Sequence, residues 1–509
     1  MNFLRKIFRK LLPIAVIALG ASALVYLPDI VPERYTDLAT YFGNERARQG
    51  LVGYSVAALR YGRLEMVGAW GTDARGIPLE SFTPMAAGEL SMAVTGYLAL
   101  QAEAEGKIEP GMPLSEIFPD QAFRAGERGS AGPGGAATLH NLLSHTGGWS
   151  PVDLDDRHPA GRNLESSLRL LTRTPPRTRP GETYGYLETG YQVLGLSLER
   201  AYQQPFAELV AAKVFLPLKM IQSDASGGEA ASRLPEGSTA FFWTAVPKAQ
   251  PLPPSLMPSS GMITTAPDFA RLMVALVKPA PGRPVLGGSA ALSKLTTPLA
   301  RIGGWTYGWQ LREPRQGPEL VLEANTEAFS SIAALWPERQ AGIVIMAPES
   351  GIFLSKAVLP TLLDGARNIL LAESTEPPLP LGRFSILFAV IASVHLIMLA
   401  GQTGNSLSWV RSVRGRADAT GRAFPITFAR VRIVTGFTVR LLIAIVLPLL
   451  ASLWLGPGST WTYLFDREPG IAGWIAVALF LGMIRNVARF SWLRTPASQV
   501  RKIRLLLRK

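Results

Sequence analysis

The sequence contains no cysteine, so its serines are the first residues to consider as nucleophiles. A serine hydroxyl becomes nucleophilic when an adjacent base, such as a lysine one helical turn away, accepts its proton. Ser91 lies near the start of an apolar segment with helical spacing, but Val94 occupies the position where such a lysine would follow. Ser144 and Ser259 have no base at a recognisable spacing. These serines predict no ordinary Ser/Lys pair, and a relocated serine mechanism stays open as the alternative.

The same composition limits metal and cofactor chemistry. A chain without cysteine excludes metal sites of the Cys type, and its four scattered histidines do not favour a His-rich site. We therefore expect no metal and no cofactor.

The segment Ser81–Ile108 has the layout of a nucleophile helix, with apolar residues at helical spacing that end at Gly106. It resembles the first motif of the serine β-lactamase and penicillin-binding-protein superfamily, in its class C esterase and peptidase branch. That family has a phenylalanine, a short linker, Gly-Ser-x-x-Lys, an apolar helix and a closing Glu-Gly-Lys-Leu. The residues that match this pattern without a gap are Phe82, Gly88 and Glu105-Gly106-Lys107-Ile108.

This resemblance places Glu89 at the family's nucleophilic serine and Met92 at its lysine. The family's acyl-enzyme chemistry requires a hydroxyl that a lysine one turn on makes nucleophilic. A Glu/Met pair supplies neither group. We therefore expect that this protein does not form the family's acyl-enzyme.

Three further segments resemble family landmarks in the same order. Leu139–Gly148 resembles the family's hLLsHtSGl segment, Pro180–Tyr191 resembles PGxxFxYSNxGY, and Gly261–Asp268 resembles GGlxSTaxD. The resemblance covers roughly residues 40–370 and implies that His140 and His145 are structural residues rather than a catalytic pair.

The resemblance also identifies the family's second and third motifs. The family uses the tyrosine of Tyr-x-Asn to relay protons, while the strand motif Lys/His-x-Gly and a backbone N–H hold the substrate carboxylate and the oxyanion. The second motif is Tyr186-Leu187-Glu188, which keeps the tyrosine and replaces the asparagine. The third motif aligns with Leu322-Glu323-Ala324, which lacks both the cation and the glycine. Tyr186 is thus the one retained catalytic candidate.

The replaced positions bring carboxylates to all three motifs. If Glu89, Glu188 and Glu323 converge on the old cleft, they repel one another, so one is protonated or a cation lies between them. This reading predicts an acidic cleft that prefers a cationic ligand. The alternative is that Glu188 or Glu323 points to solvent and that Glu89 pairs with an arginine.

The surrounding pattern predicts an α+β domain over residues 35–372. Leu51–Arg60 and Leu64–Trp70 are expected strands near its start, and the segments between Glu109 and Pro258 are mainly helical. Further strands are expected at Thr306–Leu311, Leu320–Leu322, Phe329–Trp336 and Gly342–Ala347, and a helix at Leu354–Leu371. This order matches the β-lactamase/transpeptidase-like fold, an antiparallel sheet flanked by helices with an inserted helical domain.

The chain is unusually apolar for a soluble protein, with 48% hydrophobic residues and a mean hydropathy of +0.19. Four apolar stretches are expected to cross a membrane: Leu11–Leu27, Phe384–Ala400, Ile433–Leu455 and Ile471–Ile484. Residues 1–28 are a basic start and an uncleaved signal anchor, with a cleaved signal peptide as the alternative. Residues 373–383 are a linker, and residues 384–509 hold three membrane helices with an arginine-rich loop and tail.

The net charge of +13 follows the membrane pattern. Arginines cluster between the second and third apolar stretches and after the fourth, so the positive-inside rule places the loop, the tail and the N-terminus in the cytoplasm. Residues 29–380 then lie outside, in the periplasm of a bacterial inner membrane. The basic ends are explained by membrane lipid, and we expect no nucleic-acid partner.

Two functions of different classes follow. The first is a membrane-anchored pseudoenzyme that binds a peptide, a cationic ligand or a membrane protein partner. The second is a hydrolase with rebuilt catalysis, in which Tyr186 is the base. The layout resembles the membrane-bound peptidases of the colibactin and zwittermicin type, which mature nonribosomal peptides. A transporter role has little support, since Arg440 is the one charge expected inside an apolar stretch.

Overall fold

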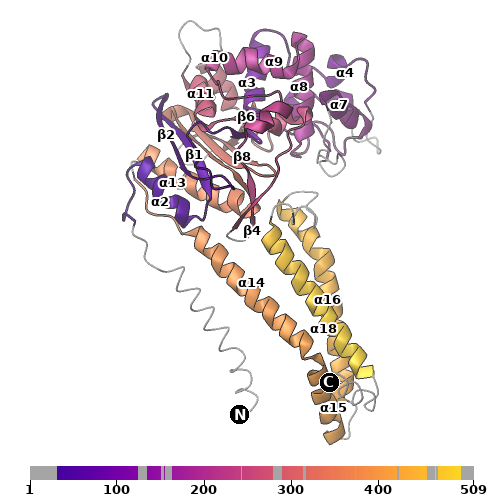
Figure 1. Cartoon of the computed structure of the whole chain (residues 1–509). Helices are drawn as coiled ribbons and strands as arrows, with labels where there is room; N and C mark the ends of the chain where they lie inside the picture. The colour runs from indigo at the N-terminus through magenta and orange to yellow at the C-terminus, as the bar shows by residue number, and fades with distance from the viewer. Residues whose placement is uncertain are drawn as a thin grey trace. The chain divides into compact units, whose positions relative to one another are not determined.

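A computed structural model describes residues 31–123, 134–150, 154, 163–241, 244–278, 289–312, 317–372, 374–420, 424–455, 465 and 468–494. The chain forms two compact units (Figure 1), one of residues 29–382 and one of residues 1–28 with 383–509. The expected anchor Leu11–Leu27 and the basic tail after Arg494 lie outside the described residues.

The centre of the first unit is a six-stranded antiparallel sheet with the order β2-β1-β10-β9-β8-β7. Its strands are β1 (Gly53–Arg60), β2 (Arg63–Gly71), β7 (Gln310–Arg312), β8 (Glu319–Asn325), β9 (Ser330–Trp336) and β10 (Ala341–Ala347). The sheet therefore combines strands from both ends of the domain, which confirms the expected α+β arrangement. The strand predicted at Leu320–Leu322 is longer, and the one predicted at Thr306–Leu311 begins only at Gln310.

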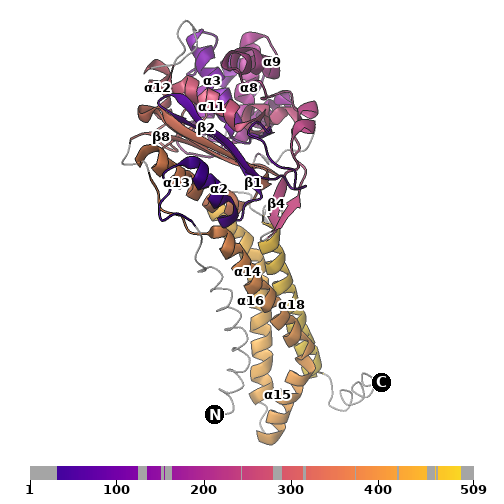
Figure 2. The same cartoon turned by 60° about the vertical axis from the view of Figure 1, so that its left-hand side comes forward.

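Helices cover both faces of this sheet (Figure 2). On one face α2 (Leu38–Arg48) and α13 (Leu359–Ala372) pack on Val56 and Ala58 of β1. On the other face α11 (Ala266–Val277) packs on Ala57 and Leu59. The alternation along β1 is the period of two that an extended strand imposes, and both faces are buried.

A helical domain is inserted between β2 and β7. Its long helices are α3 (Leu90–Ala104) and α8 (Glu188–Tyr202). The shorter helices are α4 (Leu114–Ile117), α5 (Leu139–Leu143), α7 (Leu164–Arg173), α9 (Phe206–Val210), α10 (Leu216–Leu218) and α12 (Ser289–Leu295). Two small sheets complete the unit, β3 (Met85–Ala86) with β6 (Ile263–Thr264), and β4 (Ser238–Phe241) with β5 (Thr244–Pro247) and β11 (Glu349–Ser350).

The expected linker after α13 is held against α2. Arg48 Nη2 donates to the Pro378 carbonyl at 3.1 Å, and Gln49 Nε2 donates to the Leu379 carbonyl at 3.0 Å. The buried carboxylate of Glu45 accepts from Gln49 at 2.8 Å and pairs with Arg48. These bonds fix the backbone that leads out of the first unit.

The second unit consists of α14 (Leu381–Gly404), α15 (Ser406–Thr420), α16 (Phe424–Leu455) and α18 (Pro469–Arg494) within the described residues. By length and composition, two helical segments there are apolar enough to cross a membrane, Ser385–Gly404 and Pro469–Arg494. The expected number of crossings stays a prediction. The fourth apolar stretch was expected to end at Ile484, but α18 continues to Arg494 and so includes arginines that the sequence assigned to the tail.

Candidate active-site region

The start of α3 lies against strand β8, so the first and third motif segments are neighbours. The strand pair β3–β6 delivers the chain to Gly88, whose φ of +57° lies in the left-handed region. A Cβ on Gly88 would lie 2.8 Å from the Ala324 Cβ, which explains why glycine occupies this position. The tight approach fixes where the first residues of α3 stand relative to β8.

Glu89 precedes α3 and turns its carboxylate toward the strand. Its Oε2 accepts a hydrogen bond from the backbone N–H of Asn325 at 3.1 Å. Asn325 directly follows the third motif segment, and β7 pairs with β8 only as far as Val321. The Glu89 carboxylate therefore accepts the hydrogen bond of a backbone N–H at the position where the family's strand holds the substrate.

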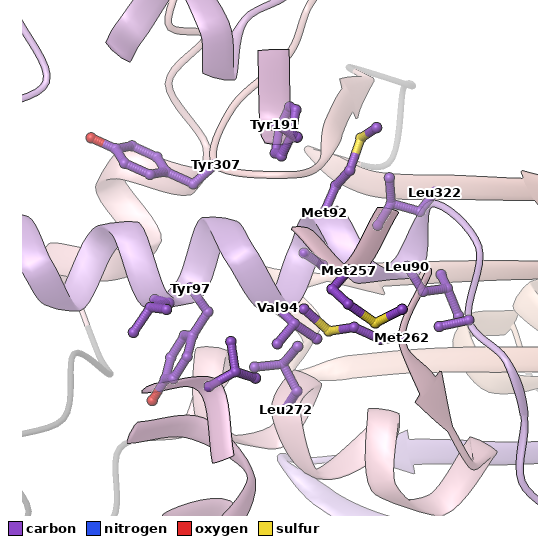
Figure 3. Close-up of a cluster of buried hydrophobic side chains, with 14 of the residues drawn as sticks. Leu90, Met92, Val94, Tyr97, Tyr191, Met257, Met262, Leu272, Tyr307 and Leu322 are labelled. Carbon is purple, nitrogen blue, oxygen red and sulfur yellow. The ribbon is translucent and has the colours of Figure 1, made fainter. Parts of the chain in front are cut away.

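Met92 follows one helical turn after Glu89 and is fully buried. Figure 3 shows it in the same apolar cluster as Leu322 and Tyr191. Its sulfur lies 4.0 Å from the hydroxyl oxygen of Tyr186, so the first and second motif segments meet here. An uncharged thioether with no exchangeable proton stands at the lysine position.

Tyr186 is half-buried and lies in an aromatic cluster around His145. The His145 ring centroid is 4.7 Å from that of Tyr186 and 4.5 Å from that of Trp305. Tyr184 joins the cluster, since its hydroxyl accepts from Trp305 Nε1 at 3.0 Å. The retained tyrosine is thus held by ring packing.

His145 is a structural residue in this arrangement. Its Nδ1 accepts the backbone N–H of Leu187 at 3.1 Å, which ties the segment around α5 to the second motif. Burial lowers the pKa of His145 to about 3. Burial also lowers the pKa of His140. Both rings are therefore neutral near pH 7.

Glu188 begins α8 and faces the turn of Met257–Gly261. Its Oε2 accepts from the Ser260 hydroxyl at 2.6 Å and lies 3.2 Å from the Ser259 hydroxyl. The carboxylate that replaces the family's asparagine is thus bound to two serine hydroxyls.

Glu323 lies on the opposite face of the sheet. Leu322 and Ala324 face the cluster that contains α3, whereas the Glu323 carboxylate pairs with Lys356 and Arg312, each at 2.8 Å. Burial alone would raise the pKa of Glu323, but the hydrogen bonds and charges of Lys356 and Arg312 hold it below its usual value. The structure therefore does not bring Glu323 to Glu89 and Glu188, because side chains alternate along β8.

The serines considered as relocated nucleophiles have structural partners. Ser91 is buried, and its hydroxyl oxygen accepts from the Met262 N–H at 3.2 Å. Ser144 donates to the His140 carbonyl at 2.7 Å. The Ser259 hydroxyl contacts the Glu188 carboxylate, the Leu256 carbonyl and the Ser260 hydroxyl. Within the part of the chain that the structure describes, no three metal-ligating side chains gather.

Comparison with known proteins agrees with this geometry. The Beta-lactamase family model matches residues 38–352. The chain is 28% identical to Esterase EstB of Burkholderia gladioli over 203 residues, 36% of this chain and 49% of the esterase. It is 25% identical to a putative D-alanyl-D-alanine carboxypeptidase of Escherichia coli (strain K12) over 138 residues, 26% of this chain and 31% of that protein. These alignments span about half or less of the curated relatives' length.

A solved structure shows the same fold. The octameric penicillin-binding protein homologue from Pyrococcus abyssi superposes with a TM-score of 0.56 and 18% identity. The superposition covers 64% of this chain and 75% of that one.

Proposed function

The chain belongs to the β-lactamase family, and we propose that it is a membrane-held member that keeps the fold but does not carry out acyl transfer. In this proposal the first unit is a binding or regulatory module. The supporting observation is the contact between the Glu89 carboxylate and the Asn325 N–H at the nucleophile position.

That contact would destabilise the negative charge that develops on the substrate oxygen during acyl transfer. The reaction places negative charge on the substrate oxygen, and losing a single donor to that oxygen slows comparable enzymes by about 10²–10³-fold. Here the Asn325 N–H already donates to Glu89, and the carboxylate would repel a second negative oxygen. A substrate carbonyl would have to displace a charge-assisted hydrogen bond without gaining a nucleophile.

The lysine position argues in the same direction. Met92 is buried among apolar side chains and contacts Tyr186, so the side chain at the lysine position cannot accept a proton. Nucleophile and base are both replaced, and these replacements fit together sterically. Such mutual packing supports a site adapted to another role.

The ligand that suits this region is a peptide or another molecule with a cationic group. Glu89 and Glu188 stand on the two segments that meet at the Met92–Tyr186 contact, and both are partly exposed. The ring of Tyr184, which is 42% exposed and contacts His145, adds a surface on which a cation or a planar group can pack. The family's carboxylate-binding cation is absent, since Leu322 takes its place.

We further propose that the second unit lies in a bacterial inner membrane and that the first unit faces the periplasm. The two apolar helices and the arginine-rich segments support this orientation. Alkaline phosphatase fused after Thr375 should be active, and green fluorescent protein fused after Lys509 should fluoresce. The reverse pattern would contradict the orientation.

The functional proposal is tested by turnover. The purified full chain should hydrolyse neither p-nitrophenyl esters nor N-acyl-D-amino acid amides above the rate of a Tyr186→Phe variant. Tyr186→Phe is the matched control because it removes only the hydroxyl of the retained catalytic candidate. Turnover that falls in this variant would refute the proposal and favour a hydrolase with rebuilt catalysis.

A further inference from the structure

The long apolar helices of the second unit carry arginines within their length. Arg440 lies in the middle of α16, while Arg485 and Arg489 lie inside the apolar helix α18. A charged side chain within a membrane helix is unfavourable, and such residues generally face a protein interior and serve a function. These three arginines therefore need an explanation that anchoring does not give.

The side chain of Arg440 extends from α16 toward α18 and lies against two glycines, Gly436 of α16 and Gly482 of α18. A Cβ on Gly482 would lie 2.1 Å from Arg440 Nε, so α18 has a glycine where the guanidinium passes. A Cβ on Gly436 would lie 3.2 Å from both Arg440 Nη1 and Asn486 Nδ2. Arg440 and Asn486 therefore meet at the contact between the two helices.

The two arginines of α18 reach the end of α14. Arg485 Nη1 donates to the side-chain carbonyl of Gln402, and Arg489 Nη2 lies 3.5 Å from the backbone carbonyl of the same residue. Arg485 and Arg489 also lie near enough to Arg440 for their charges to repel. Helices α16 and α18 thus bring three positive charges together beside Gln402 of α14, and Arg432 of α16 adds a further positive charge nearby.

Hydrogen-bond donors exceed acceptors in this cluster. The Nε atoms of Arg485 and Arg489 are buried without a partner, and so is Nδ2 of Asn486, a side chain that is 5% exposed. In the part of the chain that the structure describes, the hydrogen-bond acceptors of the three arginines are uncharged carbonyl oxygens, one from Gly436 and two from Gln402, and the Arg489 guanidinium also lies 4.6 Å from the centroid of the Trp409 ring. Among the described residues, no carboxylate forms an ion pair with Arg440, Arg485 or Arg489. Unpaired buried donors are costly, and an anion with several oxygens would satisfy them together.

We propose that Arg440, Arg485, Arg489 and Asn486 form a binding site for a phosphate group. Guanidinium groups bind phosphate oxygens in pairs, and Asn486 adds a neutral donor at the same level. Exposed apolar side chains surround the cluster on both helices, including Val439, Leu442 and Val487. Such a surface is suited to acyl chains, so the headgroup of an anionic lipid is the favoured source of the phosphate.

Binding is measured on the purified full chain by native mass spectrometry with phosphatidylglycerol and, as the zwitterionic comparison, phosphatidylcholine. The wild-type chain should bind phosphatidylglycerol more tightly. Replacing both Arg485 and Arg489 by Gln should weaken this binding by about tenfold or more, since each charge-assisted bond contributes at least that much. The matched control replaces Arg63 and Arg339 by Gln, which removes the same charge from exposed positions of the first unit, and it should retain the wild-type affinity.

A second variant guards against simple misfolding. Gln402→Glu keeps the side-chain shape and gives Arg485 an internal carboxylate, so it should fill part of the site. We expect it to lose phosphatidylglycerol affinity by about tenfold while the chain in phosphatidylcholine becomes more resistant to heat. Unchanged affinity in this variant, or equal losses in the cluster and control variants, would overturn the site.

The source of the phosphate is decided by competition. Excess inorganic phosphate that displaces phosphatidylglycerol would assign the site to a soluble phosphate compound. Phosphatidylglycerol that stays bound under the same conditions would assign it to a lipid headgroup.

Discussion

The protonation of His145 gives a quantitative test of the site, because a buried ring with a pKa of about 3 is too weak a base to replace the missing lysine. Its pKa is lowered from 6.5 to about 3, and this difference corresponds to about 5 kcal/mol of unfolding free energy. Below pH 6.5 the unfolded chain binds a proton at this residue while the folded chain does not. The stability is therefore complete above pH 6.5 and decreases as the pH falls toward 3, with about 3 kcal/mol lost by pH ~4.5.

The matched variant is His145→Asn. The backbone of His145 has a φ of +54°, a left-handed conformation that asparagine tolerates, and an asparagine carbonyl can also accept the Leu187 N–H. This variant removes the titrating ring with little change to the backbone. The difference between the pH dependence of wild type and variant then isolates His145 from the carboxylates.

The assay combines two readouts. The chain has four histidines, so selective ¹³C labelling of histidine in the full chain gives few NMR signals, and the His145→Asn variant assigns one of them. That signal should not shift between pH 8 and about 5, because the folded pKa is about 3. Urea unfolding should show a steeper loss with acid in wild type than in the variant. A signal that titrates near 6.5, or equal slopes, would refute the structural role.

Three further predictions concern packing, and each is checked by urea unfolding of the full chain. Gly88→Ala should cost about 1–3 kcal/mol more than Gly76→Ala, because both glycines have positive φ but only a Cβ on Gly88 meets Ala324. Met92→Lys should lower the free energy of unfolding, and by more as the pH falls below about 10.4, because burial lowers the pKa of the introduced amine. The control Met92→Leu should cost less than about 1.5 kcal/mol. Glu45→Ala should cost about 1–3 kcal/mol by leaving buried donors unpaired. Equal costs in the two glycine variants, a pH-independent Met92→Lys, or a neutral Glu45→Ala would each contradict the corresponding packing.

The fold was predictable from the sequence because local patterns and family motifs agreed. The motif segments indicated the order of the elements, and in the structure their polar side chains connect neighbouring elements by hydrogen bonds. Thr265 caps α11 by accepting the Asp268 N–H, and the buried carboxylate of Asp268 accepts the Gln222 N–H. Such segments are recognisable since each backbone turn needs particular polar partners.

The site was predicted less completely. The replacements at Glu89 and Met92 followed from register alone, and the structure places Met92 beside Tyr186. The predicted convergence of three carboxylates was wrong for Glu323. Side chains alternate along a strand, so Glu323 faces away from the side of the sheet that Leu322 and Ala324 face, and the sequence alone could have shown this. The bond from the Asn325 N–H was missed because a motif describes side chains, whereas this donor belongs to the backbone.

The arginine cluster was missed for a different reason. Hydropathy windows end a membrane stretch at the first charges, so Arg485 and Arg489 were assigned to the tail. In the structure α18 continues past both. The presence of Gly436 and Gly482 facing Arg440 is a signal that appears only when the two helices are packed together.

The loss of the serine nucleophile is tested most directly by the intact mass of the full chain after incubation with a fluorophosphonate. This reagent forms a covalent bond with an activated serine, whereas Glu89 and Met92 stand at the positions of the family's serine and lysine. We expect an unchanged mass. A stoichiometric adduct that maps to any serine of residues 38–352 would contradict it.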